Sequence, residues 1–292
     1  MYRSPLRYPG GKAKLAAFMR VLMCNIGHPV DTYIEPFAGG AGIAMDLLQN
    51  NFIKKVVIND YDKGIYSFWR AILTETERFV HDIETIPLTM DEWKQQRLIC
   101  MNNIGKYSYE LGFATFYMNR TNRSGIIKGG VIGGYDQTGR WKLDARFSRK
   151  KLAKRIIDIA KLKSRICLYN KDISSFIIHY LPKFDENAFV YFDPPYYEKG
   201  KQLYLNFFSH NDHLRIKKLI TESVNCDWII TYDDIPDIIS IYQDFCIKKF
   251  DLSYSASTRR DASEIMVFKN ETMIPSEKIL EDNKIFINLR NA

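Results

Sequence analysis

Residues 33–42 read Tyr-Ile-Glu-Pro-Phe-Ala-Gly-Gly-Ala-Gly, and an apolar-periodic run follows over residues 43–48. This order predicts a short strand, a glycine turn and a helix. The apolar residues 56–58 predict a second strand at 55–59 that ends on Asp60, 18 residues after Gly42. Strand, glycine turn, helix, strand and acid together form the opening βαβ unit of a nucleotide-binding sheet.

The rest of the chain extends this unit into one α/β fold. Further strands are expected at 166–170, 188–193, 228–232, 245–253 and 264–269, and helices at about 61–72, 174–181, 210–224 and 235–241. The alternation predicts a mostly parallel, Rossmann-like sheet whose last two strands form an antiparallel hairpin. We expect residues 1–74 and 161–292 to form this sheet unit and residues 75–160 to form an inserted, mainly helical module.

The inserted module is the most basic part of the chain. Residues 119–165 hold 14 Lys or Arg against three Asp, although the net charge of the whole chain is only +8. Tyr135, Trp141 and Phe147 lie within the same stretch. Such a concentration favours a polyanion-binding module, although a solvated basic face remains an alternative.

The two halves of the insert differ in pattern. Residues 75–118 look helical, and Gly-Gly pairs within 119–147 predict loops and a hairpin. Core positions expected in the helical half are Trp93, Leu98, Tyr107, Leu111, Phe116 and Tyr117.

Composition argues against several classes of protein. Apolar residues make up 46% of the chain, which excludes a disordered protein. No apolar run reaches the roughly 18 residues that a membrane span needs, and the first residues lack the apolar core of a secretion signal. The five cysteines are widely spaced without a C-x-x-C pair, so neither a disulfide framework nor a zinc site is expected. We therefore expect a reduced, cytosolic compartment.

The sequence Phe-Asp-Pro-Pro-Tyr at 192–196 lies at the C-terminal end of the strand expected from residue 188. Ligands of open α/β sheets bind at this edge. The two prolines stiffen the turn and remove two backbone donors, so the turn presents a carboxylate, carbonyl oxygens and an aromatic ring. Asp193 and the Pro194 carbonyl could each accept one N–H of an exocyclic amine such as adenine N6, and Tyr196 could stack on the ring that carries it. An ordinary strand-terminating turn is the alternative.

The glycine loop and the N-terminal turn suggest a cofactor site. The loop lacks the third glycine of the dinucleotide fingerprint, and an acid before it, Glu35, suits a cationic cofactor better than a pyrophosphate. Phe37 flanks the same loop. Asp60 is placed for ribose hydroxyls, unless it caps the next helix. Lys12, after a Tyr-Pro-Gly-Gly turn, could pair with a carboxylate or lie on the surface.

Taken in order, these motifs resemble one enzyme family. Tyr-Pro-Gly-Gly-Lys at 8–12, Glu-Pro-Phe-x-Gly-x-x-Gly at 35–42, Asn-Asp at 59–60, the basic insert and Asp-Pro-Pro-Tyr at 193–196 resemble the Dam-like (D12 class, alpha group) DNA adenine-N6 methyltransferases. The resemblance runs from Leu6 to about Lys269. It implies a methyltransferase sheet with an inserted DNA target-recognition domain, S-adenosylmethionine as methyl donor, and no metal. It also implies double-stranded DNA as substrate, base flipping, a bacterial or phage-type cytoplasmic enzyme, and a cognate restriction endonuclease as a partner.

The resemblance also assigns roles to single residues. Tyr8, Lys12, Glu35, Phe37, Asp60, Asp172 and Asp193 match the family's cofactor-binding positions, Asp60 meeting the ribose and Asp172 the adenine. Asp193, Pro194 and Tyr196 match the catalytic motif, with Asp193 also serving the cofactor's methionyl amine. Residues 116–125 resemble the start of the target-recognition hairpin. DNA contacts are expected from Arg120, Asn122, Arg123 and Lys128, and which of them meet bases stays open.

Other functions explain less of the sequence. An NAD-dependent dehydrogenase would use the βαβ unit and Asp60 but leaves 193–196 and the basic insert unexplained. Methyltransferases for cytosine N4, RNA or protein glutamine more often place Ser or Asn before Pro-Pro-Tyr, and a non-catalytic DNA-binding subunit has no need of Asp193. The pair His210 and His213 has metal-like spacing, but Ser209 with Asp212 predicts a helix capping box there.

Overall fold

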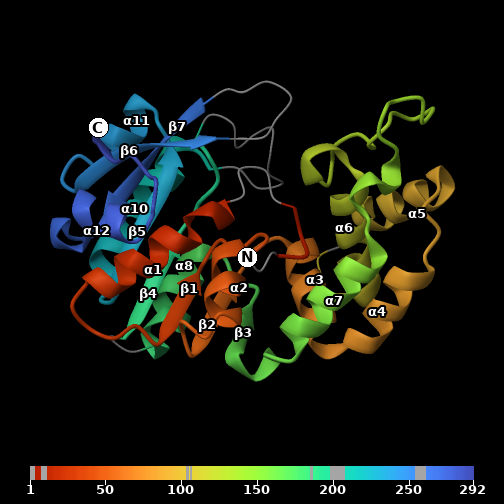
Figure 1. The fold of residues 1–292 in the computed structure, drawn as a ribbon, viewed down its shortest axis with the longest axis horizontal. Helices are drawn as coiled ribbons and strands as arrows, with labels where there is room; N and C mark the ends of the chain where they lie inside the picture. The colour runs from red at the N-terminus through yellow and green to blue at the C-terminus, as the bar shows by residue number, and fades with distance from the viewer. Residues whose placement is uncertain are drawn as a thin grey trace.

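The computed structural model describes residues 4–7, 12–102, 105, 107–184, 187–197, 208–253 and 261–292. A lobe built on a β-sheet lies beside a lobe of helices, and the two are continuous through the middle of the molecule (Figure 1). Tyr8, expected to bind the cofactor, lies outside the described residues, and so do Arg259 and Arg260, for which the sequence leaves open a contact with the DNA backbone or a solvated loop.

The sheet has eight strands in the order β3-β2-β1-β4-β5-β7-β6-β8. Their bounds are β1 Thr32–Glu35, β2 Lys55–Asn59, β3 Ile166–Tyr169, β4 Ala188–Phe192, β5 Asp227–Asp233, β6 Cys246–Ser253, β7 Asp261–Phe268 and β8 Arg290–Asn291. Strands β3, β2, β1, β4 and β5 are parallel to one another. The pairs β5–β7, β7–β6 and β6–β8 are antiparallel. The predicted α/β class, with a mostly parallel sheet and an antiparallel end, is confirmed. The short β8 was not expected.

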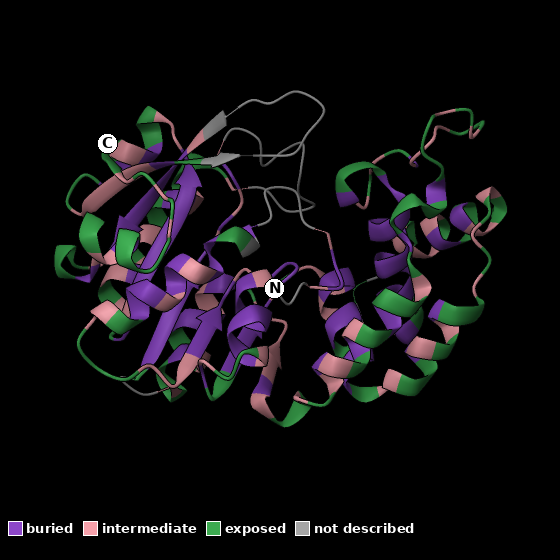
Figure 2. Ribbon diagram, viewed as in Figure 1, coloured by how far each residue is buried: buried purple, intermediate pink, exposed green. Residues whose placement is uncertain are grey.

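Helices cover both faces of the sheet. They are α1 Ala16–Asn25, α2 Gly42–Gln49, α3 Lys63–Thr74, α8 Ile173–Ser175, α10 His210–Ser223, α11 Pro236–Ile241 and α12 Glu277–Asp282. Alternate residues of β4 enter different cores: Phe189 and Tyr191 pack with α1 to α3, whereas Val190 and Phe192 pack with α10 and α11. Because both faces are covered, the central strands are buried along their length, as their purple colour shows (Figure 2).

The helical lobe consists of α4 Thr76–Thr85, α5 Met90–Met101, α6 Tyr109–Thr121 and α7 Arg149–Ala160. Helix α3 leaves the sheet and packs closely on α6. A Cβ at Gly112 would lie 2.5 Å from the Ser67 carbonyl oxygen, so glycine permits this approach. Phe68 and Phe116 stack across the same contact with centroids 5.9 Å apart. The two lobes therefore share an aromatic core.

Most predicted core positions of the insert are confirmed. Trp93, Leu111, Phe116 and Tyr117 are buried. Tyr107 is only half-buried, and Leu98 is wrong as a core position because its side chain is 49% exposed. Thr89 and Ser108 immediately precede α5 and α6 and cap them, because their hydroxyls accept backbone N–H bonds from the first turns of these helices.

The glycine-rich stretch 122–147 contains turns and two short 3₁₀ segments. The hairpin expected there is reduced to a single antiparallel bridge between Asn122 and Val131. Gly133 and Gly134 both have positive φ, which lets the chain turn back on itself without strand pairing.

In the described portion of the chain, no helix is at once long enough and apolar enough to cross a bilayer.

Candidate active site

An acid follows each of the five parallel strands at the same edge of the sheet. Glu35 ends β1 and Asp60 follows β2, while Asp172, Asp193 and Asp233 come at the ends of β3, β4 and β5. The strand order reverses between β1 and β4, which places Glu35 and Asp193 at the switch point of the sheet. Ligands of doubly wound sheets bind at this point.

Asp193 is held on one side only. Lys12 Nζ lies 2.8 Å from Asp193 Oδ1, and the Thr231 hydroxyl donates to the same oxygen at 3.0 Å. No hydrogen bond or ion pair from another described residue reaches Oδ2. The Asp193 side chain is 30% exposed, so this carboxylate has one fixed oxygen and one that faces outward.

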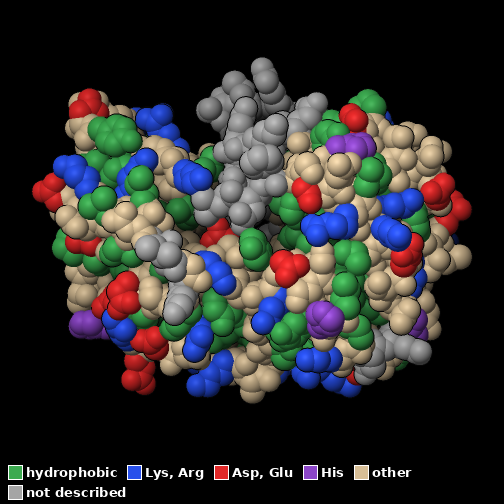
Figure 3. Space-filling view, turned by 180° about the vertical axis from the view of Figure 1, so that it is seen from behind, with side chains coloured by type: hydrophobic (Ala, Val, Ile, Leu, Met, Phe, Trp, Pro, Cys, Tyr) green, Lys and Arg blue, Asp and Glu red, His purple; other side chains and the backbone are tan. Residues whose placement is uncertain are grey.

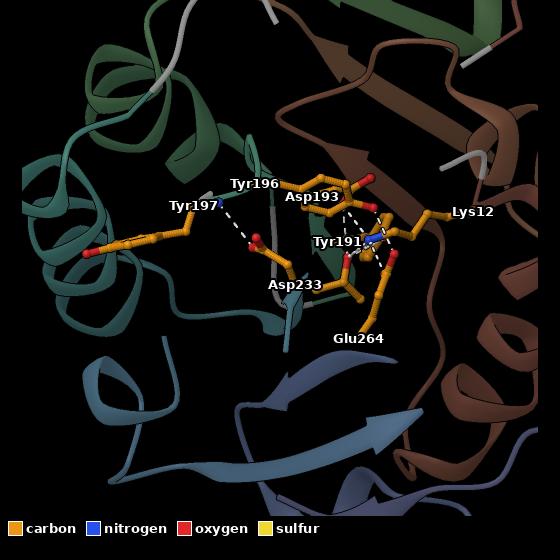
Figure 4. Close-up of polar contacts among 8 residues, drawn as sticks. Lys12, Tyr191, Asp193, Tyr196, Tyr197, Asp233 and Glu264 are labelled. Carbon is orange, nitrogen blue, oxygen red and sulfur yellow. Dashed lines mark hydrogen bonds and ion pairs between the residues drawn. The ribbon is translucent and has the colours of Figure 1, made fainter. Parts of the chain in front are cut away.

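Lys12 lies at the centre of a buried polar cluster (Figure 4). Besides Asp193, its ammonium contacts Glu264 Oε2 at 2.8 Å and donates to Thr231 Oγ1 at 2.9 Å. Burial acts to lower the pKa of Lys12, but the charges of Asp193 and Glu264 outweigh it and raise the pKa above its ordinary value. Lys12 is therefore a fixed cation, and the surface alternative is wrong because its side chain is only 4% exposed.

The aromatic residue of the corner joins the same cluster. The Tyr196 hydroxyl donates to Glu264 Oε1 at 2.8 Å, and Lys12 Nζ lies 5.4 Å from the centre of the Tyr196 ring. The residue is 9% exposed. The next residue, Tyr197, donates its backbone N–H to Asp233 at 3.1 Å, which fixes the end of the turn.

The glycine loop after β1 is held by side chains from three elements. Glu35 accepts the backbone N–H of Ala44 in the first turn of α2, and Asp60 Oδ2 accepts that of Gly39 at 2.7 Å. The Trp69 indole of α3 donates to the Gly39 carbonyl at 2.9 Å. Gly39 has φ +46°, a conformation that favours glycine. The loop is thus fixed before any ligand arrives.

Burial raises the pKa values of both acids beside the loop. The pKa of Glu35 is raised to about 8, mainly by burial and further by Asp193. The pKa of Asp60 is raised to about 7, mainly by burial and further by Asp62. Each acid would hold its proton less tightly beside a cation. The capping role considered for Asp60 is wrong, because the side chain of Asp62 caps α3.

The remaining predicted cofactor positions lie at the same edge but make few contacts. Asp172 is exposed and accepts the Ser175 N–H at 3.0 Å, so it caps α8. The half-exposed Phe37 ring meets Phe208 edge-on at 6.0 Å. The predicted capping box of Ser209 and Asp212 is confirmed at the start of α10.

The four predicted DNA contacts separate into two exposed and two buried residues. Arg123 and Lys128 are exposed, Arg120 is 6% exposed and Asn122 is fully buried. Asn122 accepts the Trp93 indole N–H at 2.8 Å and donates to the carbonyls of Ile126 and Ile127. Since its side chain is satisfied inside the protein, the structure contradicts Asn122 as a direct DNA contact and gives it the role of shaping this loop.

Arg120 is a buried cation without a described acidic partner. Its Nε has no hydrogen-bond acceptor. Its pKa is lowered to about 9, first by burial and then by the neighbouring guanidinium groups of Arg155, Arg7 and Arg146. A charge buried in this way costs free energy unless an anion compensates it.

Arg7 attaches the start of the chain to the end of α6. Arg7 exchanges backbone hydrogen bonds with the side chain of Asn119 at 2.7 and 2.6 Å, and its guanidinium donates to the Asn122 carbonyl.

On the face seen in Figure 3, Lys and Arg side chains are scattered over both lobes among acidic ones. That face is therefore not one continuous basic patch.

Sequence reasoning missed Glu264 and Thr231 of the cluster, and it also missed Asp233, which holds the end of the turn. Glu264 and Asp233 lie opposite each other on β7 and β5, and Glu264 is 3% exposed. A buried acid within the apolar run 264–268 was the available signal, because acids are rarely buried without a partner. The partner could not be identified, since Lys12 lies at the other end of the chain.

The sequence model of the D12 class N6 adenine-specific DNA methyltransferases matches residues 8–256. The chain is also 25% identical over 205 residues to the Type II methyltransferase M.MjaIII of Methanocaldococcus jannaschii, covering 65% of this chain and 68% of that protein. Among solved structures, it aligns with the rRNA methyltransferase AviRa of Streptomyces viridochromogenes at 13% identity and a TM-score of 0.40, over 94% of this chain and 89% of that one.

Proposed function

The chain belongs to the D12 class N6 adenine-specific DNA methyltransferase family, and from this premise we propose that it transfers a methyl group from S-adenosylmethionine to adenine N6 in duplex DNA after extruding the base. DNA methylation follows from the family.

The open oxygen of Asp193 is the observation that carries the proposal. Lys12 and Thr231 both contact Oδ1, so the carboxylate cannot rotate freely and Oδ2 is left for a donor from outside. An exocyclic amine is such a donor. Asp193 Oδ2 and the Pro194 carbonyl then accept one N6–H each, and this hold favours the tetrahedral nitrogen whose lone pair attacks the methyl group. Asp193 stabilises the positive charge that N6 carries until it loses its proton.

Tyr196 supplies the stacking surface for the extruded base. Stacking on an aromatic ring contributes about 1–3 kcal/mol, which offsets part of the cost of taking a base out of the duplex. Tyr196 follows two prolines and its hydroxyl is bonded to Glu264, so the ring is fixed at both ends.

The side chains at the sheet edge suit a cationic cofactor. When bound, S-adenosylmethionine supplies an electrophilic methyl group on a sulfonium. Asp193 would accept a hydrogen bond from the methionyl amine, and Asp60 would accept hydrogen bonds from the ribose hydroxyls. Glu35 would lie beneath the glycine loop. Phe37 and Asp172 would lie near the adenine. The raised pKa values of Glu35 and Asp60 are consistent with a site for a cation, because a bound positive charge favours the ionised forms of both acids. Tyr8 and Lys12 are proposed to complete this site.

Residues 75–160 are proposed to form the DNA target-recognition domain. Arg123 and Lys128 are exposed on the loop after α6. Arg120, at the end of α6, is a buried cation, and a DNA phosphate would supply the anion that it lacks. Exposed Trp141, with Arg140 5.4 Å from its ring, lies on the following loop.

A cognate restriction endonuclease is proposed as a partner in the cell. M.MjaIII is named as a Type II methyltransferase, which supports this partner by similarity.

Product analysis tests the proposed reaction. The protein is incubated with duplex DNA and S-adenosylmethionine carrying a tritiated methyl group, and the DNA is digested to nucleosides. We expect the label in N6-methyladenine. Label in N4-methylcytosine, or in RNA offered in parallel, would contradict the proposal, as would tight binding of NADH with no binding of S-adenosylmethionine.

A further inference from the structure

Glu264 has a place in the site that no sequence motif assigns. It lies on β7, an antiparallel strand outside the parallel part of the sheet, directly opposite Asp233 of β5. Its side chain is 3% exposed. A carboxylate that is buried this deeply loses its hydration, which costs free energy unless polar partners compensate it.

The two oxygens of Glu264 contact two different parts of the active site (Figure 4). Oε1 accepts the Tyr196 hydroxyl at 2.8 Å, and Oε2 lies 2.8 Å from Lys12 Nζ. Lys12 in turn contacts Asp193. The Glu264 carboxylate therefore contacts both Tyr196, whose ring is proposed to stack on the base, and Lys12. Lys12 in turn fixes Asp193, which is proposed to hold the amine of the base.

We propose that Glu264 is a positioning residue for methyl transfer, which orients the Tyr196 ring and sets the charge around Asp193. The inference rests on the proposed roles of Tyr196 and Asp193. Glu264 touches neither the base nor the methyl group, and it acts through the two residues that do.

The first effect is geometric. A hydrogen bond at the Tyr196 hydroxyl restrains rotation about the Cα–Cβ bond, because that rotation displaces the hydroxyl oxygen, and it thereby fixes the direction of the long axis of the ring. The two prolines before Tyr196 restrain its backbone. Methyl transfer requires in-line approach, so a small tilt of the stacked base costs rate while the duplex stays bound. Loss of the Tyr196–Glu264 bond is therefore expected to lower kcat and leave KM for DNA almost unchanged.

The second effect is electrostatic. Lys12 carries one positive charge, and Asp193 and Glu264 together carry two negative charges, so the cluster is one charge negative. The donor has a sulfonium that the product, S-adenosylhomocysteine, lacks. A net negative cluster whose Lys12 and Glu264 side chains are buried favours the donor over its product. Glu264 supplies the charge that Lys12 does not neutralise.

Two substitutions separate these effects. Tyr196→Phe keeps the ring and removes its hydroxyl, and Tyr109→Phe is its matched control because the Tyr109 hydroxyl makes the same type of bond to Asp82, at 2.7 Å. Glu264→Gln keeps an acceptor for Tyr196 and removes the charge, and Glu281→Gln is its control on the exposed surface of α12. Steady-state kinetics give kcat and KM for DNA, and calorimetry gives the affinities for S-adenosylmethionine and S-adenosylhomocysteine.

For Tyr196→Phe we expect kcat to fall about tenfold, with KM for DNA and both cofactor affinities within about twofold of the wild type. For Glu264→Gln we expect the preference for S-adenosylmethionine over S-adenosylhomocysteine to fall about tenfold. A cofactor stoichiometry of one shows that a variant is folded.

Wild-type values of kcat in Tyr196→Phe, or an unchanged donor-to-product preference in Glu264→Gln, would overturn the role of Glu264. If Glu264→Gln does not fold, the split between kcat and KM in Tyr196→Phe still decides. Failure of the proposed function has a different signature, because the wild type itself would then form no N6-methyladenine.

Discussion

Lys12 and Asp193 are 181 residues apart in the sequence, and Lys12 Nζ lies 2.8 Å from Asp193 Oδ1. This ion pair attaches the start of the chain to the corner that follows β4. It also decides which oxygen of Asp193 is available, because Thr231 donates to the same Oδ1. The chemistry proposed for Asp193 thus depends on a residue outside its own motif.

Replacing Lys12 is predicted to shift the pH dependence of methylation. Burial raises the pKa of Asp193, whereas the charge and hydrogen bond of Lys12 lower it. Lys12→Gln removes the lowering contribution, so Asp193 takes up its proton at a higher pH and the acidic limb of the rate profile moves upward. The rate at saturating DNA and cofactor, measured from pH 5 to 9, checks this, and an acidic limb that stays in place or moves downward would refute it.

Glu35 is predicted to make the free protein less stable as the pH rises. Its pKa is about 8 in the folded protein against an ordinary 4.5, so the folded state holds this proton more tightly between these values. Stability then falls as the pH increases through that window, by up to about 1.4 kcal/mol per pH unit. Glu35→Gln keeps an acceptor for the Ala44 N–H and has no such proton. Urea unfolding at pH 5.5, 6.5 and 7.5 is expected to show a smaller decline in Glu35→Gln, and parallel declines would disprove the assignment.

Arg120→Met is predicted to stabilise the free protein and weaken its binding to DNA. The substitution removes a buried cation that no described acid compensates, so the free energy of unfolding is expected to rise by about 1 kcal/mol. The loss of one phosphate contact is expected to reduce the slope of log K against log salt by about 1. Arg215→Met removes an exposed arginine of α10 and serves as control. A destabilised variant with unchanged salt dependence would show that Arg120 has a structural role instead.

Asn122→Ala is predicted to act through folding. It leaves the Trp93 indole and the carbonyls of Ile126 and Ile127 without their partner, which costs about 3 kcal/mol. Asn283→Ala, which removes one exposed hydrogen bond to Ile279, is expected to cost less than about 1 kcal/mol. Thermal unfolding measures both. If Asn122→Ala keeps wild-type stability and loses DNA affinity, the residue contacts DNA directly after all.

The fold was predictable because its signals are local. The glycine turn between β1 and α2 and the apolar runs of β1 to β5 each determine the structure of their own residues. Leu98 was misplaced because helix α5 has no regular apolar face, so periodicity could not tell its buried side from its exposed one.

Site residues could be predicted from the sequence only where they lie together in one short motif. Asp193, Pro194 and Tyr196 follow one strand, and their position at the sheet edge follows from that strand. Glu264 reaches the cluster through strand pairing in the antiparallel part of the sheet, which depends on the tertiary fold. For Asn122 the residue type suggested a DNA contact, whereas its burial depends on Trp93, 29 residues earlier.

The most direct test of the account is methyl transfer by Asp193→Ala. We predict that the rate of N6-methyladenine formation falls by at least about 1000-fold, while duplex DNA binding in a gel-shift assay stays close to that of the wild type. Methylation within about tenfold of the wild-type rate would remove Asp193 from the mechanism and contradict the account.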